Sequence, residues 1–402
     1  MSMNDTPSSE RLHIGIFGRR NAGKSSLINA LTGQDLAIVS PQKGTTTDPV
    51  YKAMELLPLG PVVLIDTPGL DDEGELGQQR VRKAHQVLNK TDLAVLVIDS
   101  TQGVTAEDEN IRERILAKGI PLVTVLNRSD CGGNAQLPAG PAVLAVSCRN
   151  GTNIQELKEL LARQSKSGHT GPRLLPDMVQ AGDLLILVVP VDSSAPKGRL
   201  ILPQQQVIRA LLDIHAAALV VQDTELKTAL AMLSSPPRMV ITDSQAFARV
   251  AADTPQEVLM TSFSILFARY KGDLPITVQG AGAISSLPNG ARVLISEGCT
   301  HHRQCADIGT VKLPHWLEQY TGRKFEYTFS SGTDFPDELT GFDLIIHCGG
   351  CMLNEREVKY RMQCARDQGV PMTNYGIAIA QMHGILKRSL QPFPDIAKLL
   401  PP

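Results

Sequence analysis

Residues 18–25 have the sequence Gly-Arg-Arg-Asn-Ala-Gly-Lys-Ser, which fits the phosphate-binding pattern G-x-x-x-x-G-K-[ST]. The apolar run Leu12–Phe17 precedes this octapeptide and a helical pattern, Ser26–Leu31, follows it, as the strand–loop–helix context of the motif requires. Glycine allows backbone N–H groups to point at phosphate oxygens, and the helix adds the positive end of its dipole. Lys24 would contact the β- and γ-phosphates of a nucleotide, and the Ser25 hydroxyl would bind Mg²⁺.

Two further segments would complete the magnesium and γ-phosphate site. An apolar strand ends in Asp-Thr-Pro-Gly at 66–69, so Asp66 would hold Mg²⁺ through water and the Gly69 N–H would contact the γ-phosphate. The polar stretch 43–48 has the composition of a mobile loop. Its Thr46 would close on the metal when the γ-phosphate is present.

Base recognition is expected at the ends of two more strands. Strand Pro121–Leu126 is followed by Asn-Arg-Ser-Asp at 127–130, which looks like the N-K-x-D box of GTP-binding proteins with arginine where lysine is usual. The Asp130 carboxylate would accept hydrogen bonds from two guanine N–H groups, and adenine has no matching pair of donors. The next strand ends in Ser147 and Cys148, whose backbone N–H groups would meet the guanine carbonyl.

These boxes occur in the order of a GTP-binding domain and define the predicted nucleotide site. Its nucleotide-binding residues are Gly18, Asn21, Ala22, Gly23, Lys24, Ser25, Ser26, Asn127, Asp130, Ser147 and Cys148. The residues expected to act in hydrolysis are Lys24, Thr46, Asp66 and Gly69, and the Mg²⁺ ligands are Ser25, Thr46 and Asp66. Nucleotide state would change two switch loops, Pro41–Pro49 and Leu70–Gly77.

The hydrolytic machinery departs from that of Ras-type proteins, because Leu70 stands where they have a water-positioning glutamine. Asn21 in the phosphate loop resembles the TrmE–Era–EngA group of GTPases, whose members can use this asparagine to help bind K⁺ in place of an arginine finger. This resemblance implies slow intrinsic hydrolysis that K⁺ and the pairing of two GTP-binding domains accelerate. The alternative is that Asn21 only shapes the loop.

Five of the seven cysteines lie in the last third of the chain, together with several histidines. Strand Val293–Ile295 leads to Cys299 and His301, and strand Asp343–Ile346 leads to His-Cys-Gly-Gly-Cys at 347–351. Loops that follow parallel strands gather at one edge of the sheet. The two segments should therefore converge if their strands are neighbours.

Cys299, Cys348 and Cys351 would supply three thiolates, an incomplete set for a 4Fe-4S cluster. Candidates for a weaker or exchangeable fourth ligand are His301, His302, His347, Glu297 or a ligand from outside. The same cysteines with a histidine would instead form a Cys₃His zinc site, and a site without metal is a third alternative. Cys305 and Cys364 fall in helical segments and are expected to be packed thiols.

Composition narrows the class of protein. The chain has 402 residues, 42% hydrophobic and 20% charged, which is ordinary for a globular protein of two or three domains. Its net charge of −2 and the lack of long Lys/Arg runs argue against a nucleic-acid surface. There is no run of apolar residues long enough to span a membrane, and the first eleven residues do not resemble a signal peptide. A cytoplasmic protein without disulfides is expected.

Apolar runs that alternate with helical patterns predict an α/β fold of three consecutive units with mainly parallel sheets, the first a P-loop GTPase domain. The expected domains are 11–165 for GTP binding, 172–272 for dimerisation or interaction, and 280–402 for the metal site. Predicted strands of the last two are Leu184–Val191, Ala217–Val221, Met239–Thr242, Val258–Phe263, Arg292–Ser296, Arg323–Phe329, Phe342–Ile346 and Val370–Thr373. The Gly/Pro-rich stretch Lys271–Pro288 is expected to separate them, and helices are expected at Ile308–Tyr320 and Glu355–Gln368.

The combination of an Era-like GTP-binding domain with a C-x-H … H-C-x-x-C pattern resembles the FeFe-hydrogenase H-cluster maturation GTPases, the HydF family. Here the pattern is Cys299-Thr300-His301 and His347-Cys348-Gly349-Gly350-Cys351, and the resemblance runs from about residue 11 to the end. It implies a GTP-binding domain, a dimerisation domain and a domain with a 4Fe-4S cluster on the three cysteines. His301 and His347 would either ligate the cluster or orient its neighbours.

The same resemblance implies a scaffold or carrier. A diiron precursor would be built with two radical-SAM partner enzymes and then passed to the apo FeFe-hydrogenase. The protein would act as a homodimer or higher homo-oligomer, without nucleic acid or a membrane as a partner. Two alternatives remain open at this stage. One is a ribosome- or tRNA-associated GTPase, which would need a basic module, and the other is a switch GTPase with a structural zinc domain.

Overall fold

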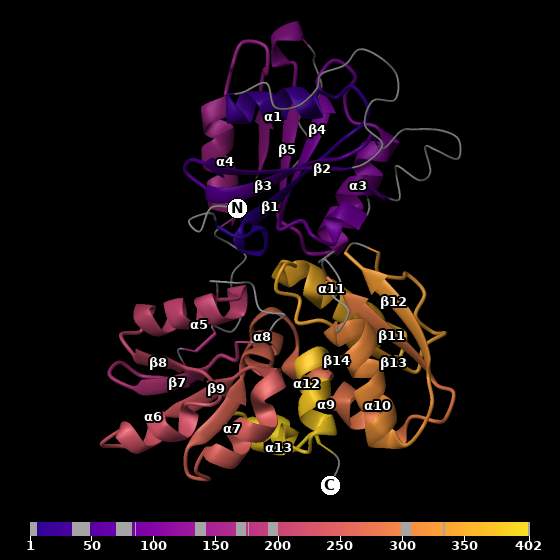
Figure 1. Cartoon of the computed structure of the whole chain (residues 1–402). Coiled ribbons are helices and arrows are strands. Elements are labelled where there is room, and N and C mark those ends of the chain that lie inside the picture. The colour runs from indigo at the N-terminus through magenta and orange to yellow at the C-terminus, as the bar shows by residue number, and fades with distance from the viewer. Residues whose placement is uncertain are drawn as a thin grey trace. The chain divides into compact units, whose positions relative to one another are not determined.

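Three β-sheets organise the chain, one in the unit Met1–Thr170 and two in the unit Gly171–Pro402 (Figure 1). The computed structural model describes residues 6–33, 49–69, 83–84, 86–132, 142–165, 174–175, 177–191, 200–298, 307–332 and 334–400. Within these residues, ten of the eleven strand pairings are parallel, which confirms the predicted α/β class with mainly parallel sheets. The boundary between the second and third predicted domains stays a prediction.

The first unit contains a six-stranded sheet in the order β2-β3-β1-β4-β5-β6. Its strands are β1 (Leu12–Phe17), β2 (Val50–Leu56), β3 (Gly60–Asp66), β4 (Leu93–Asp99), β5 (Leu122–Asn127) and β6 (Val143–Ala145). Its described α-helices are α1 (Lys24–Thr32), α3 (Ala106–Ala117) and α4 (Ile154–Ser165). One hydrophobic cluster joins the sheet to α1 and α4, and a second joins it to α3, so helices cover both faces. Among the described strands of this sheet, β2 alone is antiparallel to its neighbour.

The second unit contains two parallel four-stranded sheets, in the orders β10-β9-β7-β8 and β12-β11-β13-β14. The strands of the first are β7 (Leu184–Val188), β8 (Ala217–Val221), β9 (Met239–Thr242) and β10 (Leu259–Ser262). Those of the second are β11 (Arg292–Glu297), β12 (Glu326–Ser331), β13 (Leu344–His347) and β14 (Met372–Asn374). All eight lie at or close to predicted strands.

Helices connect these strands and cover the sheets. They are α5 (Leu202–Asp213), α6 (Leu226–Met232), α7 (Phe247–Asp253), α8 (Phe263–Lys271), α9 (Leu274–Gly282), α10 (Leu313–Thr321), α11 (Glu355–Asp367), α12 (Tyr375–Met382), α13 (Leu386–Ser389) and α14 (Pro394–Ala397). The predicted helix Ile308–Tyr320 is divided, because a π-helical turn, Ile308–Lys312, precedes α10 and Pro314 lies at the start of α10.

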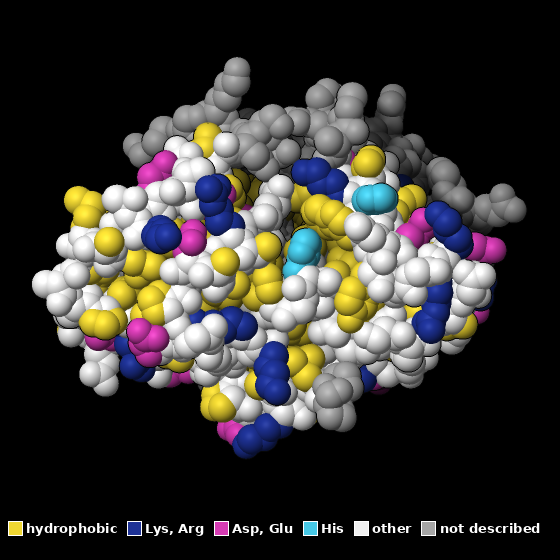
Figure 2. Space-filling model, turned by 60° about the horizontal axis from the view of Figure 1, so that its bottom comes forward, with side chains coloured by type: hydrophobic (Ala, Val, Ile, Leu, Met, Phe, Trp, Pro, Cys, Tyr) yellow, Lys and Arg dark blue, Asp and Glu magenta, His cyan; other side chains and the backbone are white. Residues whose placement is uncertain are grey.

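Charged side chains are dispersed on the one face of the molecule that Figure 2 shows. On the face shown in Figure 2, Lys and Arg side chains lie singly or in small groups between apolar and uncharged ones, which agrees with the near-neutral net charge of −2. No helix in the described part of the chain is long and apolar enough to cross a membrane.

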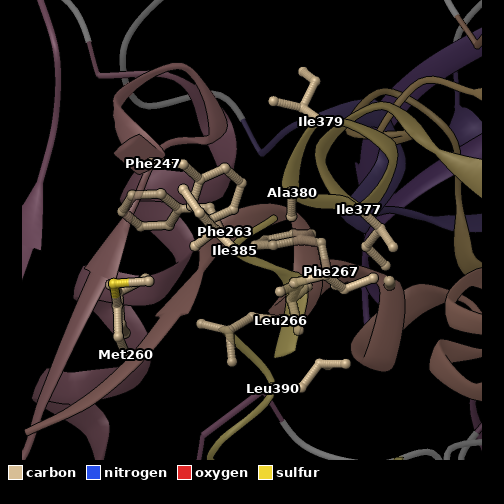
Figure 3. Packing of buried hydrophobic residues seen from close by; sticks show 14 of the residues in the cluster. Phe247, Met260, Phe263, Leu266, Phe267, Ile377, Ile379, Ala380, Ile385 and Leu390 are labelled. Carbon is tan, nitrogen blue, oxygen red and sulfur yellow. The ribbon is translucent and has the colours of Figure 1, made fainter. Parts of the chain in front are cut away.

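One hydrophobic core serves both sheets of the second unit. Side chains of β10, α8 and α12 meet in this core, and Figure 3 shows Met260, Phe263, Leu266, Ile377 and Ala380 among them. A smaller cluster joins the other face of the second sheet to α11. Because one core is shared, the position of α8 is fixed relative to the sheet that carries the predicted metal site.

The stretch Lys271–Pro288 does not form an irregular break, since half of it is helix α9 and a 3₁₀ turn, Ala283–Ser286, follows this helix. Asp273 caps this helix by accepting a hydrogen bond from the Ile276 N–H, and Pro275 lies in its first turn, where proline is tolerated. A Cβ added at Gly280 would lie 2.1 Å from the Met372 carbonyl oxygen, so glycine lets α9 approach β14 closely. The glycine that suggested a break instead permits close packing.

Candidate functional site

Three residues of the predicted phosphate loop have positive backbone φ angles. Gly18, Asn21 and Gly23 have φ values of +146°, +58° and +96°, in the region that favours glycine and tolerates asparagine. A Cβ at Gly23 would lie 2.1 Å from Asn127 Nδ2, so this glycine is needed for close approach as well as for its backbone angle. The left-handed Asn21 fits the loop-shaping role that the sequence left open.

Lys24 and two of the predicted magnesium ligands, Ser25 and Asp66, lie within this loop or beside it. The Lys24 ammonium is buried and donates to the carbonyls of Gly18 (2.9 Å) and Arg19 (2.8 Å). The Ser25 hydroxyl donates to Asp66 Oδ2 at 2.8 Å, so two of the three predicted Mg²⁺ ligands are adjacent. Burial raises the pKa of Asp66, while the Ser25 hydrogen bond and the charge of Lys24 oppose this rise.

The segment after β3 is tied back to the phosphate loop. The Thr67 hydroxyl donates to the Ile16 carbonyl at 2.6 Å. A Cβ at Gly69 would lie 3.1 Å from the Arg20 backbone nitrogen, which places the Gly69 backbone against the loop. Thr46 and both predicted switch loops, apart from residue 49, lie outside the described residues.

The side chains of Asn127 and Arg128 connect the base-recognition segment to the phosphate loop by hydrogen bonds. Asn127 is 3% exposed, and its Nδ2 donates to the Ala22 carbonyl at 3.1 Å while its Oδ1 accepts from the Cys148 N–H at 3.4 Å. Arg128 contacts Asp99 Oδ2 at 2.7 Å and donates to the Asn21 carbonyl at 3.0 Å. The planar guanidinium has several donors and so bonds to both acceptors, which accounts for arginine at this position.

The predicted guanine-contacting side chain faces solvent. Asp130 is exposed, and a hydrogen bond from Ser147 holds its pKa below the usual value. Ser147 is fully buried, and burial raises the pKa of the neighbouring Cys148 thiol to about 11, with the Asp130 charge adding to the rise. Asp130 is therefore a carboxylate acceptor at neutral pH, and Cys148 stays a neutral thiol.

One contact of the phosphate loop was missed in the sequence. Arg19 Nε lies 3.3 Å from Oδ2 of Asp108, a carboxylate only 1% exposed that also accepts from the Thr105 N–H and hydroxyl. Burial raises the pKa of Asp108. The pattern Thr105-x-x-Asp108 could have revealed the cap of α3, although not its partner in the loop.

In the second unit, the loop after β13 carries the Cys-x-x-Cys pair. β11 and β13 are adjacent parallel strands, with Ser296 opposite His347. The two strands that lead to the predicted metal ligands are therefore neighbours, as convergence of their loops requires. The Cys348 N–H donates to the Ser296 carbonyl at 2.8 Å. Gly350 has φ +64°, which turns the loop between the two cysteines.

The Cys348 sulfur lies where the chain leaves β11 toward Cys299. It accepts hydrogen bonds from the backbone N–H of Gly298 (3.0 Å) and of Gly350 (3.4 Å). Burial raises the pKa of the Cys351 thiol, the neighbouring Cys348 adds to the rise, and the Lys271 ammonium opposes it. Cys299, His301, His302 and Cys305 lie outside the described residues.

His347 is 3% exposed and uses both ring nitrogens within the protein. Its Nδ1 lies 2.6 Å from the Cys348 carbonyl, and its Nε2 lies 3.1 Å from Arg361 Nη1. Arginine can only donate, so Nε2 accepts and Nδ1–H donates. A neutral imidazole has one such acceptor nitrogen, so this arrangement favours the orienting role of His347 over the ligating one.

Arg361 is a second residue that the sequence did not reveal. It is fully buried, donates to Glu357 Oε1 at 3.0 Å and to the Gly332 carbonyl at 2.6 Å, and lies 5.0 Å from the Phe335 ring centroid. Both charged residues of this pair lie on the buried stripe of α11. Charges within an otherwise apolar stripe could have marked them.

Glu297, a candidate fourth ligand, ends β11 and accepts a hydrogen bond from the Tyr375 hydroxyl at 3.2 Å. Burial and the charge of Glu297 raise the pKa of Tyr375, so this hydroxyl remains a donor. Among the described residues, no group of three or more His, Cys, Asp or Glu side chains is arranged to hold a metal ion.

Three family models match successive parts of the chain. The model described as "50S ribosome-binding GTPase" matches residues 13–128. The models "Hydrogen maturase F dimerization domain" and "Hydrogen maturase F tetramerization domain" match residues 174–272 and 275–392, together more than half of the chain. The chain belongs to the hydrogen maturase F family. In this member, the dimerization match includes the sheet β10-β9-β7-β8 and α8, and the tetramerization match includes the cysteine loop.

Curated relatives of this hydrogen maturase F chain match over a shorter region. The tRNA modification GTPase MnmE of Chromobacterium violaceum is 38% identical over 156 residues, which cover 38% of this chain and 34% of the relative. MnmE of Burkholderia lata is 36% identical over 161 residues, with coverage of 38% and 34%. The chain thus spans about a third of the length of these relatives. A structure of Aquifex aeolicus Era bound to GDP.AlF4- aligns with 80% of this chain and 94% of that one, at 18% identity and a TM-score of 0.34.

Proposed function

We propose that this hydrogen maturase F protein is a GTP-hydrolysing scaffold or carrier that binds a 4Fe-4S cluster and delivers a diiron precursor to an apo FeFe-hydrogenase. Membership of the family supports this role, and the observation that carries it is the environment of the Cys348 sulfur. Two backbone N–H groups point at this sulfur, and one belongs to Gly298, the residue before Cys299. Hydrogen bonds from backbone N–H groups favour the thiolate form that iron requires.

The donor set fits such a cluster. Cys348 and Cys351 share one short loop, and the chain toward Cys299 begins at hydrogen-bonding distance from the Cys348 sulfur. When bound, the cluster would supply an iron with an exchangeable position, at which the diiron precursor is held as cargo. The protein would provide three thiolates, with His347 fixing the Cys348 backbone through its hydrogen bond to that carbonyl. The fourth position is left to Glu297, His301, His302 or an outside ligand.

The cluster proposal is tested by anaerobic reconstitution of the full chain with iron and sulfide. The parent should turn brown and absorb near 400 nm, with iron and sulfide in equal amounts. Cys348→Ser should lose most of this absorbance and keep GTP hydrolysis, because the two sites lie in different units. Cys364→Ser is the matched control and should keep the colour, since Cys364 packs beside the α11 cluster. Zinc without sulfide in the parent would instead support a structural zinc domain.

For hydrolysis, we infer that the nucleotide phosphates replace the loop carbonyls now bonded to Lys24. Ser25 and Asp66 are already adjacent and, with Thr46, would hold Mg²⁺, which neutralises charge on the phosphates. The Gly69 N–H would contact the γ-phosphate. Asp130 would bind the guanine edge, while Asn127 and Arg128 keep the loops in place. Nucleotide-dependent change in the switch loops would bias association with two radical-SAM enzymes and the hydrogenase.

We propose that the protein hydrolyses GTP slowly and that K⁺ stimulates this hydrolysis through Asn21, which is exposed in the phosphate loop. At constant ionic strength, the parent should hydrolyse GTP several-fold faster in K⁺ than in Na⁺, and Asn21→Ala should lose this difference. Equal rates of the parent in the two salts would contradict the role of K⁺ and leave GTP binding unaffected.

We also propose a homodimer or higher homo-oligomer, supported by the descriptions of the two family models. The location that we propose is the cytoplasm, as the sequence predicts. A tRNA-modifying role is not proposed, because the similarity to MnmE covers 38% of the chain. The dispersed charges in Figure 2 also give no support to a nucleic-acid surface on that face.

A further inference from the structure

Lys271 brings a buried positive charge to the cysteine loop. It is the last residue of α8, only 4% exposed, and its Nζ donates to the carbonyls of Leu353 (3.2 Å) and Cys351 (3.4 Å). The ring of Phe267, one turn earlier, lies 5.9 Å from the ammonium. Burial of a lysine is costly, so these surroundings must compensate a charge that water no longer solvates.

The end of α8 packs closely against α11, the helix that follows the loop. A Cβ added at Gly272 would lie 2.8 Å from Met362 Cε, so α8 and α11 touch at this point. Lys271 lies in the segment matched by the dimerization model, and the loop lies in the segment matched by the tetramerization model. The contact therefore links one family domain to the cysteine pair of the other.

The positive charge of Lys271 would affect the redox state of a cluster bound to the cysteine loop. Thiolates at Cys348 and Cys351 would be negative, and reduction of a cluster bound to them adds further negative charge. A positive charge in a poorly solvated site stabilises the more negative state most strongly. Arg361, a second buried cation in contact with the loop through His347, is bonded directly to the carboxylate of Glu357, so its field at the loop is largely cancelled.

We propose that Lys271 is a positioning residue of the cysteine loop and raises the reduction potential of a cluster bound there. Its hydrogen bonds fix the backbone at Cys351 and Leu353, and its charge favours the reduced state. This inference rests on the proposed cluster function, and it goes beyond that function by assigning control of the cluster to a helix of the dimerization segment.

The test is a potentiometric titration of the reconstituted full chain, followed by the absorbance near 400 nm and by electron paramagnetic resonance. The variants are Lys271→Met, Lys271→Gln and Lys271→Arg, with Lys359→Met as the control because Lys359 is half exposed on α11. Lys271→Met should destabilise the reduced state at least tenfold relative to the oxidised state, a fall of about 59 mV for a one-electron couple. Lys271→Arg and Lys359→Met should stay close to the parent.

Lys271→Met with full iron content and an unchanged potential would overturn the inference. If this variant does not fold or does not bind iron, Lys271→Gln, which retains N–H donors without the charge, is judged by the same criterion. If both neutral variants fail to bind iron while Lys271→Arg and Lys359→Met bind it fully, the result would support a role of the positive charge in positioning the cysteine loop. A parent chain that forms no cluster refutes the proposed function itself, so the two failures are distinct.

Discussion

Arg361 is fully buried beside the cysteine loop, where the carboxylate of Glu357 lies one helical turn away. Removal of one partner from a buried ion pair leaves an uncompensated charge, whereas replacement of both by apolar groups is often nearly neutral. Arg361→Met should therefore lower the free energy of unfolding by about 3–5 kcal/mol. Glu357→Leu combined with Arg361→Met should recover most of this loss. Denaturant unfolding of the second unit measures both.

The control for this cycle lies on the same helix. Lys359 and Glu355 form an exposed i,i+4 pair, so Lys359→Met should change the free energy of unfolding by no more than about 0.5 kcal/mol. A double variant that is no more stable than Arg361→Met would show that the cost lies in the lost contacts to His347 and Gly332, and not in an unpaired Glu357.

At this scale the sequence reveals residues whose chemistry dictates their spacing. The phosphate loop and the Cys-x-x-Cys pair could be predicted because phosphate and metal binding restrict which residue types stand at which separation. Asp108 and Lys271 escape prediction because each acts on a partner distant in sequence. The ion pair of Arg361 with Glu357 is local, and only its contacts with His347 and Gly332 are distant in sequence. Lys271 and Leu353, for example, are 82 residues apart and meet only in the folded chain.

At the scale of helices and strands, α9 depends on one glycine. Gly280 approaches β14 so closely that a Cβ would lie 2.1 Å from the Met372 carbonyl oxygen. The backbones of α9 and β14 cannot move apart without disturbing the hydrophobic core around them. Gly280→Ala should lower the free energy of unfolding by about 1–3 kcal/mol, despite the higher helix propensity of alanine. The neighbouring Gln279 is exposed, so Gln279→Ala should have little effect in the same assay. A Gly280→Ala variant as stable as the parent would show that α9 can shift.

The buried parallel strands, such as β4 and β7, could be predicted because continuous apolar runs are typical of strands buried on both faces. β2 could not, since it is a largely exposed edge strand with a mixed pattern, paired antiparallel to β3. The glycine and proline of α9 made its sequence look like a break and not a helix. In the structure, Pro275 lies in the first turn of α9 and Gly280 packs against β14. Composition indicates local preference, whereas tertiary contacts decided the outcome here.

At the scale of the whole molecule, the described hydrophobic clusters separate by unit. Two lie within Met1–Thr170 and two within Gly171–Pro402, and none includes residues of both. Each unit thus has its own core, whereas the two sheets of the second unit share one. Such an arrangement predicts two cooperative unfolding transitions for the full chain, and not three.

Calorimetry of the full chain can assign these transitions through their ligands. A ligand stabilises only the unit that binds it, so GTP with Mg²⁺ at 100 times its dissociation constant should add about 2.7 kcal/mol to one transition and leave the other in place. Lys24→Ala should abolish this shift, because Lys24 lies in the phosphate loop of the first unit. Iron and sulfide should move only the other transition. A single transition that nucleotide and iron both displace would mean that the units unfold together, and nucleotide state could then reach the cysteine loop through stability alone.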